Sequence, residues 1–400
     1  MLVINQPYLE EKEGKTKLIS DIDVDGKISS IYFEVENNYS KYLCYERGDA
    51  FLIGILNWAM RHGHDIKSVA PITEELLYNI NKFLIPSLTK YDNTLTPIKI
   101  VADMESEPIK NAGGVGTGIS CGVDSFHSIH NNYKSPYPGM SLTHLCINSV
   151  GSFHNGYKKY GIEKARDEVY ERAQEVADEL GLPLIKSMSN IKEEFNVYFD
   201  YAHTYYSMFA VYCLQKLWKI YYYGSHGYDF SHFNLKNNSN IASGHYELLS
   251  LPCFSTHSLH LYSEGGTEDR LEKTKLIVDD KLVQKYLHVC CSQGVNCNNC
   301  IKCCRTLLTL DALGKIDNFS EVFDIEYYKK HRENYLIWLY KQHLDNDPML
   351  NAVYDILKKD IKLTIKLKYY MHKVFSIRKT ENKTVIKFLV LKLSIKNKNY

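Results

Sequence analysis

The stretch from Gly114 to His130, GVGTGISCGVDSFHSIH, constrains the fold more than any other part of the chain. Its four glycines leave the backbone bare over nine positions, and a helix-like pattern follows directly. A helix start needs only one capping residue, so we expect a ligand to approach this backbone closely. In open α/β sheets, anions bind where a strand turns into a helix, because free amides and the helix dipole point there. We therefore expect a phosphate loop after the first strand of the sheet, with Asp124 and Ser125 opening the next helix.

Strand-like and helix-like segments alternate after this stretch. The strand-like segments are GGVGTGIS, LTHLCINSV, LPLIKSMSN, IYYYGSHGY and HSLHLYSEGG, and the helix-like ones are DSFHSIHNNY, IEKARDEVYERAQEVADELG and YYSMFAVYCLQKLWK. Strands separated by helices of this length are typical of right-handed crossovers in a parallel, doubly wound sheet. We expect residues 111–281 to form an α/β domain of this class.

Three further regions surround this domain. Residues 1–110 hold the strand-like SSIYFEVE and TPIKIVAD with two amphipathic stretches between them, GDAFLIGILNWAMRHG and ITEELLYNINKFLIPSL, which predicts an accessory α+β domain. Residues 282–357 combine a cysteine cluster with helical segments. Residues 358–400 end in alternating Lys and aliphatic residues, which predicts a basic β-hairpin with its turn at Thr380 to Lys383.

The cysteines point to a metal. The chain has 11, and six of them lie between Cys290 and Cys304. Cys290, Cys297, Cys300 and Cys303 form C-x6-C-x2-C-x2-C, and such close spacing lets a turn present four thiolates to a tetrahedral Zn²⁺ at about 2.3 Å. Four sulfurs close the coordination shell, so we expect this zinc to be structural. Cys291 or Cys304 could replace a neighbouring ligand.

Two common phosphate-binding motifs do not fit the opening stretch. The Walker pattern needs a Lys before the Ser or Thr at the helix start, and the dinucleotide fingerprint needs an acidic residue about 20 positions further on. Neither is present. The hexapeptide Ser120-Cys121-Gly122-Val123-Asp124-Ser125 instead resembles the PP-loop SGGxDS of N-type ATP pyrophosphatases. It departs from that pattern at Cys121, which stands where the family usually has Gly.

The resemblance implies a chemistry. In that family the loop holds the pyrophosphate of ATP while a substrate oxygen attacks the α-phosphate and forms an adenylate. The residues expected to bind ATP are Ser120, Cys121, Gly122, Val123, Asp124, Ser125 and Asn148. Asp124 would organise Mg²⁺, and Ser125 would cap the helix toward the phosphate.

Two more segments are candidates for the same site. EGGTEDRLEK offers Arg270 and Lys273 to an anionic substrate or to the α-phosphate, so we count both, with Asp124 and Ser125, as candidate catalytic residues. A charged run of this kind is also typical of a solvated surface. GSHGYDF, from Gly224 to Phe230, follows a strand and could line the nucleotide crevice.

A longer resemblance covers residues 112–310. A PP-loop followed some 170 residues later by NCNNCIKCCRT is similar to 7-cyano-7-deazaguanine synthase and its relatives. This implies an adenine nucleotide α-hydrolase-like fold with a zinc-bound C-terminal region. The added N-terminal region and the long tail depart from the synthase. The resemblance therefore supports an adenylation reaction in this chain more strongly than it supports a deazapurine substrate.

Charge is unevenly distributed along the chain. Residues 358–400 contain 13 Lys or Arg and two acids, a net charge of +11, so the remainder carries −10 of the total of +1. This tail resembles extensions of enzymes of bacterial surface-polysaccharide assembly. The basic tail would be suited to binding an anionic membrane surface or a partner protein. It is equally consistent with an ordinary edge hairpin whose lysines prevent aggregation.

The function expected from the sequence is ATP-dependent adenylation of a carboxylate or amide-like oxygen on a small molecule, such as a sugar or cell-envelope precursor. The alternatives are nitrile or amide formation like that of the synthase, sulfur transfer to tRNA, and a non-catalytic nucleotide sensor. The acidic body argues against a nucleic-acid partner. The start of the chain does not look like a signal peptide, and no run of about 18 apolar residues occurs. We expect a cytoplasmic protein. Attachment to the inner membrane through the tail and assembly into a homodimer are two options that the sequence leaves open.

Overall fold

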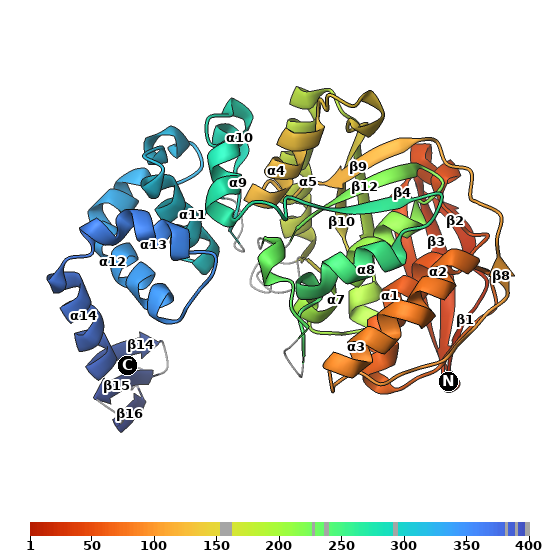
Figure 1. Ribbon diagram of the computed structural model, residues 1–400, viewed down its shortest axis with the longest axis horizontal. Coiled ribbons are helices and arrows are strands. Elements are labelled where there is room, and N and C mark those ends of the chain that lie inside the picture. Colours follow the sequence, from red (N-terminus) through yellow and green to blue (C-terminus); the bar gives the residue numbers. More distant parts are fainter. Residues whose placement is uncertain are drawn as a thin grey trace. The chain divides into compact units, whose positions relative to one another are not determined.

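The computed structural model describes residues 1–152, 162–225, 229–235, 240–290, 295–380, 383–388 and 391–396. The chain divides into two compact units, Met1–Asn296 and Cys297–Tyr400 (Figure 1).

The first unit is built on a central sheet that has eleven strands within the described residues, in the order β13-β12-β9-β10-β11-β4-β3-β1-β5-β7, with β2 beside β3. Its strands are β1 (Leu2–Ile4), β2 (Tyr8–Lys12), β3 (Lys15–Val24), β4 (Lys27–Glu36), β5 (Ile66–Ser68), β7 (Ile100–Val101), β9 (Gly114–Gly118), β10 (His144–Ser149), β11 (Leu184–Ser189), β12 (Trp218–Gly224) and β13 (His260–Glu264). A separate pair is formed by β6 (Ile72–Thr73) and β8 (Met104–Glu105).

Strand directions show how the sheet is assembled. The five strands from β13 to β11 are parallel, β11-β4-β3-β1 are antiparallel, and β1-β5-β7 are parallel again. The first unit is therefore mixed α/β with a mostly parallel sheet, as the sequence predicts. Strands of residues 1–110 and strands of residues 111–281 belong to this one sheet.

The helices of the first unit are α1 (Asp49–His62), α2 (Glu74–Asn79), α3 (Ile85–Tyr91), α4 (Val123–Asn132), α5 (Ile162–Leu180), α6 (Ile191–Glu194), α7 (Phe199–Cys213), α8 (Glu247–Phe254), α9 (Arg270–Ile277) and α10 (Lys281–Tyr286). One large apolar cluster joins buried residues of α1, α7 and α8 to residues of the sheet. Figure 1 shows these three helices beside the strands. Within it, the ring of Phe209 meets Phe33 and Phe51 edge to face. This core fixes the sheet that carries the glycine-rich loop.

The glycines of β9 have a packing role that the sequence analysis missed. A Cβ on Gly114 would lie 2.8 Å from the Leu217 carbonyl oxygen, and a Cβ on Gly116 would lie 2.7 Å from the Trp218 ring. The partner that approaches these two glycines is therefore the neighbouring strand of the chain itself, and not a ligand. Gly114 and Gly116 are therefore explained without a ligand.

Trp218 also corrects an expected helix. YYSMFAVYCLQKLWK was expected to be helical throughout, but α7 ends at Cys213 and Trp218 opens β12. A Trp side chain fits a half-buried pleated surface well, and here it is fully buried beneath β9. Tertiary packing thus overrides the helical pattern at the end of this segment.

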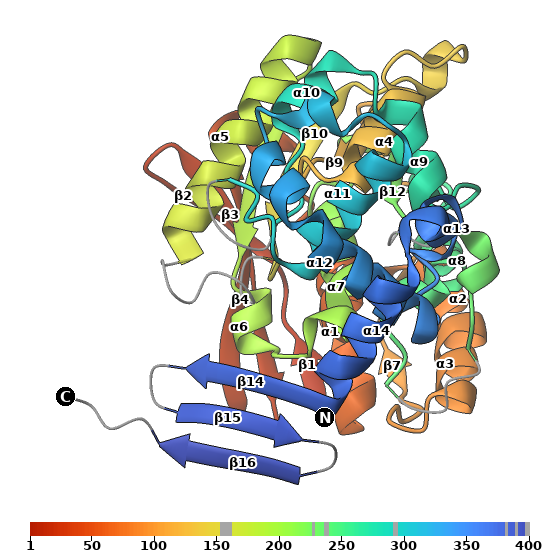
Figure 2. The same cartoon turned by 90° about the vertical axis from the view of Figure 1, so that its left-hand side faces the viewer.

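The second unit is helical, with a small antiparallel sheet (Figure 2). Its elements are α11 (Ile301–Ala312), α12 (Ile325–Leu344), α13 (Asn351–Leu357), α14 (Leu363–Val374), β14 (Phe375–Thr380), β15 (Lys383–Phe388) and β16 (Leu391–Lys396). The expected hairpin corresponds to β14 and β15, which pair up to Thr380 and Lys383, and β16 adds a third strand. The expected turn residues 381–382 lie outside the described residues, and α14 precedes the hairpin.

Candidate functional site

The glycine-rich stretch forms a tight loop between β9 and α4. Cys121 is fully buried and has a φ of 58°. This left-handed conformation favours glycine, and a side chain there costs about 1–2 kcal/mol. The position at which the sequence departs from the PP-loop pattern is thus one where the backbone has the conformation of a glycine.

Hydrogen bonds hold the loop closed. The Ser120 hydroxyl accepts a hydrogen bond from the Gly122 amide at 3.3 Å, and the Ser125 hydroxyl donates to the Gly122 carbonyl at 3.0 Å. Gly122 is the N-cap of α4, and no side chain within the described residues caps this helix. The first turn of α4, with buried Val123 and Ser125, therefore presents its amides and the positive end of its dipole.

Two cations from α9 converge on the start of α4. Arg270 Nη2 lies 3.0 Å from Asp124 Oδ2, and Lys273 Nζ lies 3.7 Å from Asp124 Oδ1. Some 146 residues separate Arg270 from Asp124 in the sequence. The fold thus brings together the four candidate catalytic residues, and within the charged run the side chains of Arg270 and Lys273 are largely buried.

Lys273 is an unusual lysine because its side chain is fully buried. Its Nζ donates a hydrogen bond of 2.6 Å to the Ser225 hydroxyl at the end of β12. Burial lowers the pKa of Lys273 below its usual value, while the charges of Asp124 and Glu247 oppose this shift. Arg270 Nε is also buried and has no hydrogen-bond partner among the described residues. Arg270 and Lys273 thus both face the Asp124 carboxylate beside the loop, and the charges of Glu247 and Glu268 also act on Lys273.

His127 belongs to the same cluster and was missed in the sequence analysis. It is buried one turn after Asp124, and its Nε2 lies 3.8 Å from Glu268 Oε2. Burial, together with the charge of Lys273, lowers the pKa of His127 to about 4, so the imidazole is neutral at pH 7. The spacing of three residues from Asp124 on a predicted helix was the available signal, because residues at this spacing share a helix face.

Asn148 lies on the neighbouring strand. Cys146 of β10 pairs with Gly118 of β9, so Asn148 stands level with the start of the loop. Its side-chain oxygen accepts a hydrogen bond of 2.7 Å from the Ser187 hydroxyl on β11. The expected nucleotide residues thus lie at one end of β9 and β10.

The four cysteines of the predicted motif come together. The Sγ atoms of Cys290, Cys297, Cys300 and Cys303 all lie within 4.8 Å of one another, so this cluster could hold a metal ion such as zinc. Cys304 is not one of the four, and its Sγ faces backbone carbonyls of residues 298 and 299. Cys291 lies outside the described residues.

A short backbone link joins the segment before the cysteines to the loop. The His288 amide donates a hydrogen bond of 2.8 Å to the Cys121 carbonyl. The side chain of Asn296 holds this segment in place, because it accepts from the amides of Val289 and Cys290 and donates to the Leu287 carbonyl. The geometry of the left-handed loop residue is therefore tied to the stretch that ends at Cys290.

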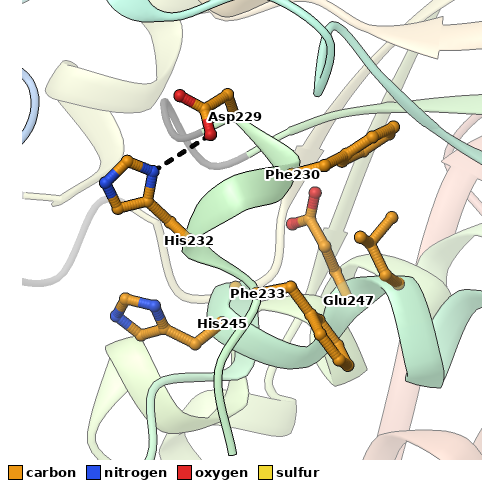
Figure 3. A pocket seen from close by; sticks show the side chains of 8 residues that line it. Asp229, Phe230, His232, Phe233, His245 and Glu247 are labelled. Atoms are coloured by element: carbon orange, nitrogen blue, oxygen red, sulfur yellow. Dashed lines mark hydrogen bonds and ion pairs between the residues drawn. The ribbon is translucent and has the colours of Figure 1, made fainter.

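Of the segment GSHGYDF, residues 226–228 lie outside the described residues. Ser225 contacts Lys273, and Asp229 and Phe230 line a small pocket (Figure 3). Comparison with family models, with curated proteins and with solved structures gave no match for this chain. No helix in the described ranges is long and apolar enough to cross a membrane.

Proposed function

We propose that this chain is an enzyme of the PP-loop ATP pyrophosphatase type, which adenylates an oxygen of a small-molecule acceptor and releases pyrophosphate. The observation that carries this proposal is the convergence of Arg270 and Lys273 on Asp124, directly beside the loop Ser120–Ser125. A glycine-rich turn alone is common, but a turn faced by a buried lysine and a largely buried arginine is suited to a polyphosphate.

The sheet order supports the same location. In a doubly wound sheet, ligands bind at the carboxyl ends of the strands, where the strand order reverses. From β9 the chain proceeds to β10 and β11 on one side and then to β12 and β13 on the other. The reversal falls between β9 and β12, and the candidate loop follows β9. A doubly wound, adenine nucleotide α-hydrolase-like arrangement of residues 111–281 is part of the proposal.

The residues present favour attack at the α-phosphate of ATP over attack at the γ-phosphate. A loop that grips the β- and γ-phosphates makes pyrophosphate the leaving group and leaves the α-phosphate as the electrophile. Arg270 and Lys273 would stabilise the charge that develops there as the bond to pyrophosphate breaks. Asp124 would hold Mg²⁺, which neutralises phosphate charge when bound. The chain has no Walker lysine to serve γ-phosphate transfer.

Sulfur transfer to tRNA is less well supported by the site. Such an enzyme needs a reactive thiolate near the nucleotide. Burial raises the pKa of Cys121, the cysteine of the loop, to about 12, so its thiol stays protonated at pH 7. We therefore keep a small-molecule acceptor in the proposal.

ATP with Mg²⁺ is expected to stabilise the wild-type protein and to fail to stabilise the Ser125→Ala and Asp124→Asn variants. A ligand that binds only the native state adds about 2.7 kcal/mol when its free concentration is about 100-fold above Kd. Thermal unfolding with and without ATP measures the effect. Ser106→Ala is the control, because Ser106 is exposed and lies outside the loop. Equal stabilisation of wild type and loop variants would show that ATP does not bind at this loop.

A further inference from the structure

Helix α14 of the second unit exposes a row of large apolar side chains. Leu363, Leu367, Tyr370 and Met371 are 70%, 53%, 48% and 69% exposed. They stand at positions i, i+4, i+7 and i+8, which share one face of a helix. We call this row the α14 stripe. A single exposed apolar residue is common on protein surfaces, but a contiguous stripe of four is typical of an interaction surface.

Another face of α14 holds the helix on its own unit. Ile365 on this face is buried, and α14 packs against α12. The Tyr369 ring meets the Tyr340 ring of α12 edge to face, with 5.4 Å between the ring centroids. Lys368 Nζ lies 2.6 Å from Glu333 Oε1, also on α12. The helix is thus anchored by one face, which leaves the α14 stripe open.

Lysines edge the α14 stripe on both sides. The helical period places Lys362 and Lys366 along one edge of the stripe and Lys368 along the other. α14 contains no acidic residue, and the nearest acid before it, Asp360, pairs with Arg332 at 2.6 Å. A lysine can lay its methylene groups along an apolar surface while its ammonium group stays among polar groups. The helix therefore presents apolar side chains between two rows of positive charge.

The positive charge continues beyond α14 in the sequence. Residues 358–400 carry a net charge of +11, whereas the −10 of the remainder is spread over 357 residues. Lysines that protect an edge hairpin would explain the charge of the strands, but they do not explain an exposed apolar face on the helix before them. An apolar stripe edged by lysines is typical of helices that lie in the interface of an anionic membrane.

We propose that α14 docks this protein on an anionic membrane surface, with the α14 stripe inserted beneath the lipid headgroups and the flanking lysines beside the lipid phosphates. The apolar face of such a helix enters about 5–10 Å into the boundary between headgroups and acyl chains. This docking does not depend on the proposed adenylation, and its test needs no ATP.

Other occupants fit the α14 stripe less well. A second copy of the chain would bring the same positive tail against it, and like charges repel. An acidic partner protein would match the lysines, but it would also need an apolar surface shaped to the stripe. A bilayer supplies negative headgroups and an apolar layer together, and its lipids adapt to the shape of the helix.

The test uses the full chain with vesicles of equal parts phosphatidylglycerol and phosphatidylcholine, and with vesicles of phosphatidylcholine alone. Cosedimentation measures binding. We expect binding to the anionic vesicles to be at least about tenfold tighter than to the neutral ones, because each lysine near an anionic surface contributes about fivefold. Salt should weaken it, since salt screens exposed charges. Equal binding to both kinds of vesicle, or no binding to the anionic ones, overturns the proposal.

Substitutions assign the binding to the α14 stripe. Leu363→Ser and Leu367→Ser each remove an exposed apolar side chain without changing the charge, so each should weaken binding to the anionic vesicles by at least about tenfold. Lys362→Gln should weaken it about fivefold. Ile28→Ser is the matched control, because Ile28 on β4 is 64% exposed and lies in the first unit. Unchanged binding in both leucine variants would mean that charge alone attaches the tail, which contradicts an inserted stripe.

Three further measurements distinguish the other occupants. A wild-type dimer without vesicles that dissociates in Leu367→Ser would assign the stripe to a second copy. A melting temperature clearly lower in Leu367→Ser than in the wild type would place the stripe against another part of the chain, because substitution of an exposed residue is mostly near-neutral. Binding to polyglutamate without binding to vesicles would indicate an acidic partner protein. Each of these results contradicts docking on a membrane.

Discussion

Replacing Lys273 with methionine is expected to slow AMP formation by about 10²–10³-fold, the loss that follows removal of one preorganised charge-stabilising group from an active site. Methionine keeps the length and much of the volume of the buried side chain but removes the ammonium group that faces Asp124 and Ser225. Release of AMP and pyrophosphate, measured on purified protein, gives the rate.

Lys275→Met is the matched control for this prediction. Lys275 lies on the same helix, α9, but is exposed, so its substitution should leave the rate within a factor of about two, since surface changes are mostly near-neutral. An equal loss in both variants would mean that the site does not depend on the buried cation. An unchanged rate in Lys273→Met would remove Lys273 from the proposed chemistry.

The second large effect is expected at the cysteine cluster. Cys300→Ser should reduce the metal content from one zinc per chain to near zero and lower the stability of the protein by several kcal/mol. Structural zinc contributes about 10–16 kcal/mol of binding free energy in small zinc-finger peptides, and this energy is folding energy. Elemental analysis after dialysis and thermal unfolding measure the two quantities.

Cys304→Ser is the control for the zinc prediction, because Cys304 neighbours Cys303 on α11 but is not one of the four clustered thiols. It should retain zinc. Loss of zinc in Cys304→Ser but not in Cys300→Ser would show that the ligand set has been assigned wrongly. Iron in place of zinc, or a protein equally stable after chelation, would contradict a structural zinc site.

The α/β class and the cysteine cluster could be predicted because both depend on residues that lie close together in the sequence. Period-two and helical patterns give strands and helices, and the C-x6-C-x2-C-x2-C spacing gives the four thiols that lie within 4.8 Å. The N-terminal strands were harder to find. Only SSIYFEVE was expected as a strand before the first helix, although β3 also buries Leu18 and Ile22. Charged and polar residues interrupt the pattern in β3, and its pairing with β4 stabilises it only in the folded sheet.

The candidate site was predictable only in part. The loop could be located because its residues are contiguous. The contacts of Arg270 and Lys273 with Asp124 depend on how α9 packs against α4, and no local pattern encodes that packing. Glu247, whose charge acts on Lys273, was missed for the same reason, whereas Ser225 lies within the segment GSHGYDF that was expected to line the site. The expectation that Gly114 and Gly116 mark a ligand's approach was wrong, because the close packing of Leu217 and Trp218 requires glycine at these two positions.

The central claim is that ATP bound at the loop Ser120–Ser125 reacts at its α-phosphate. Incubation of the protein with ATP carrying a radioactive label at the α-phosphate or at the γ-phosphate tests this most directly, because slow attack by water already reveals which bond breaks. Lys273→Met is the control for contaminating hydrolases. We expect the α-label in AMP and the γ-label in pyrophosphate, with both products reduced in Lys273→Met. An α-label in ADP with a γ-label in inorganic phosphate, lost in Lys273→Met, would contradict adenylation and indicate phosphoryl transfer at this site.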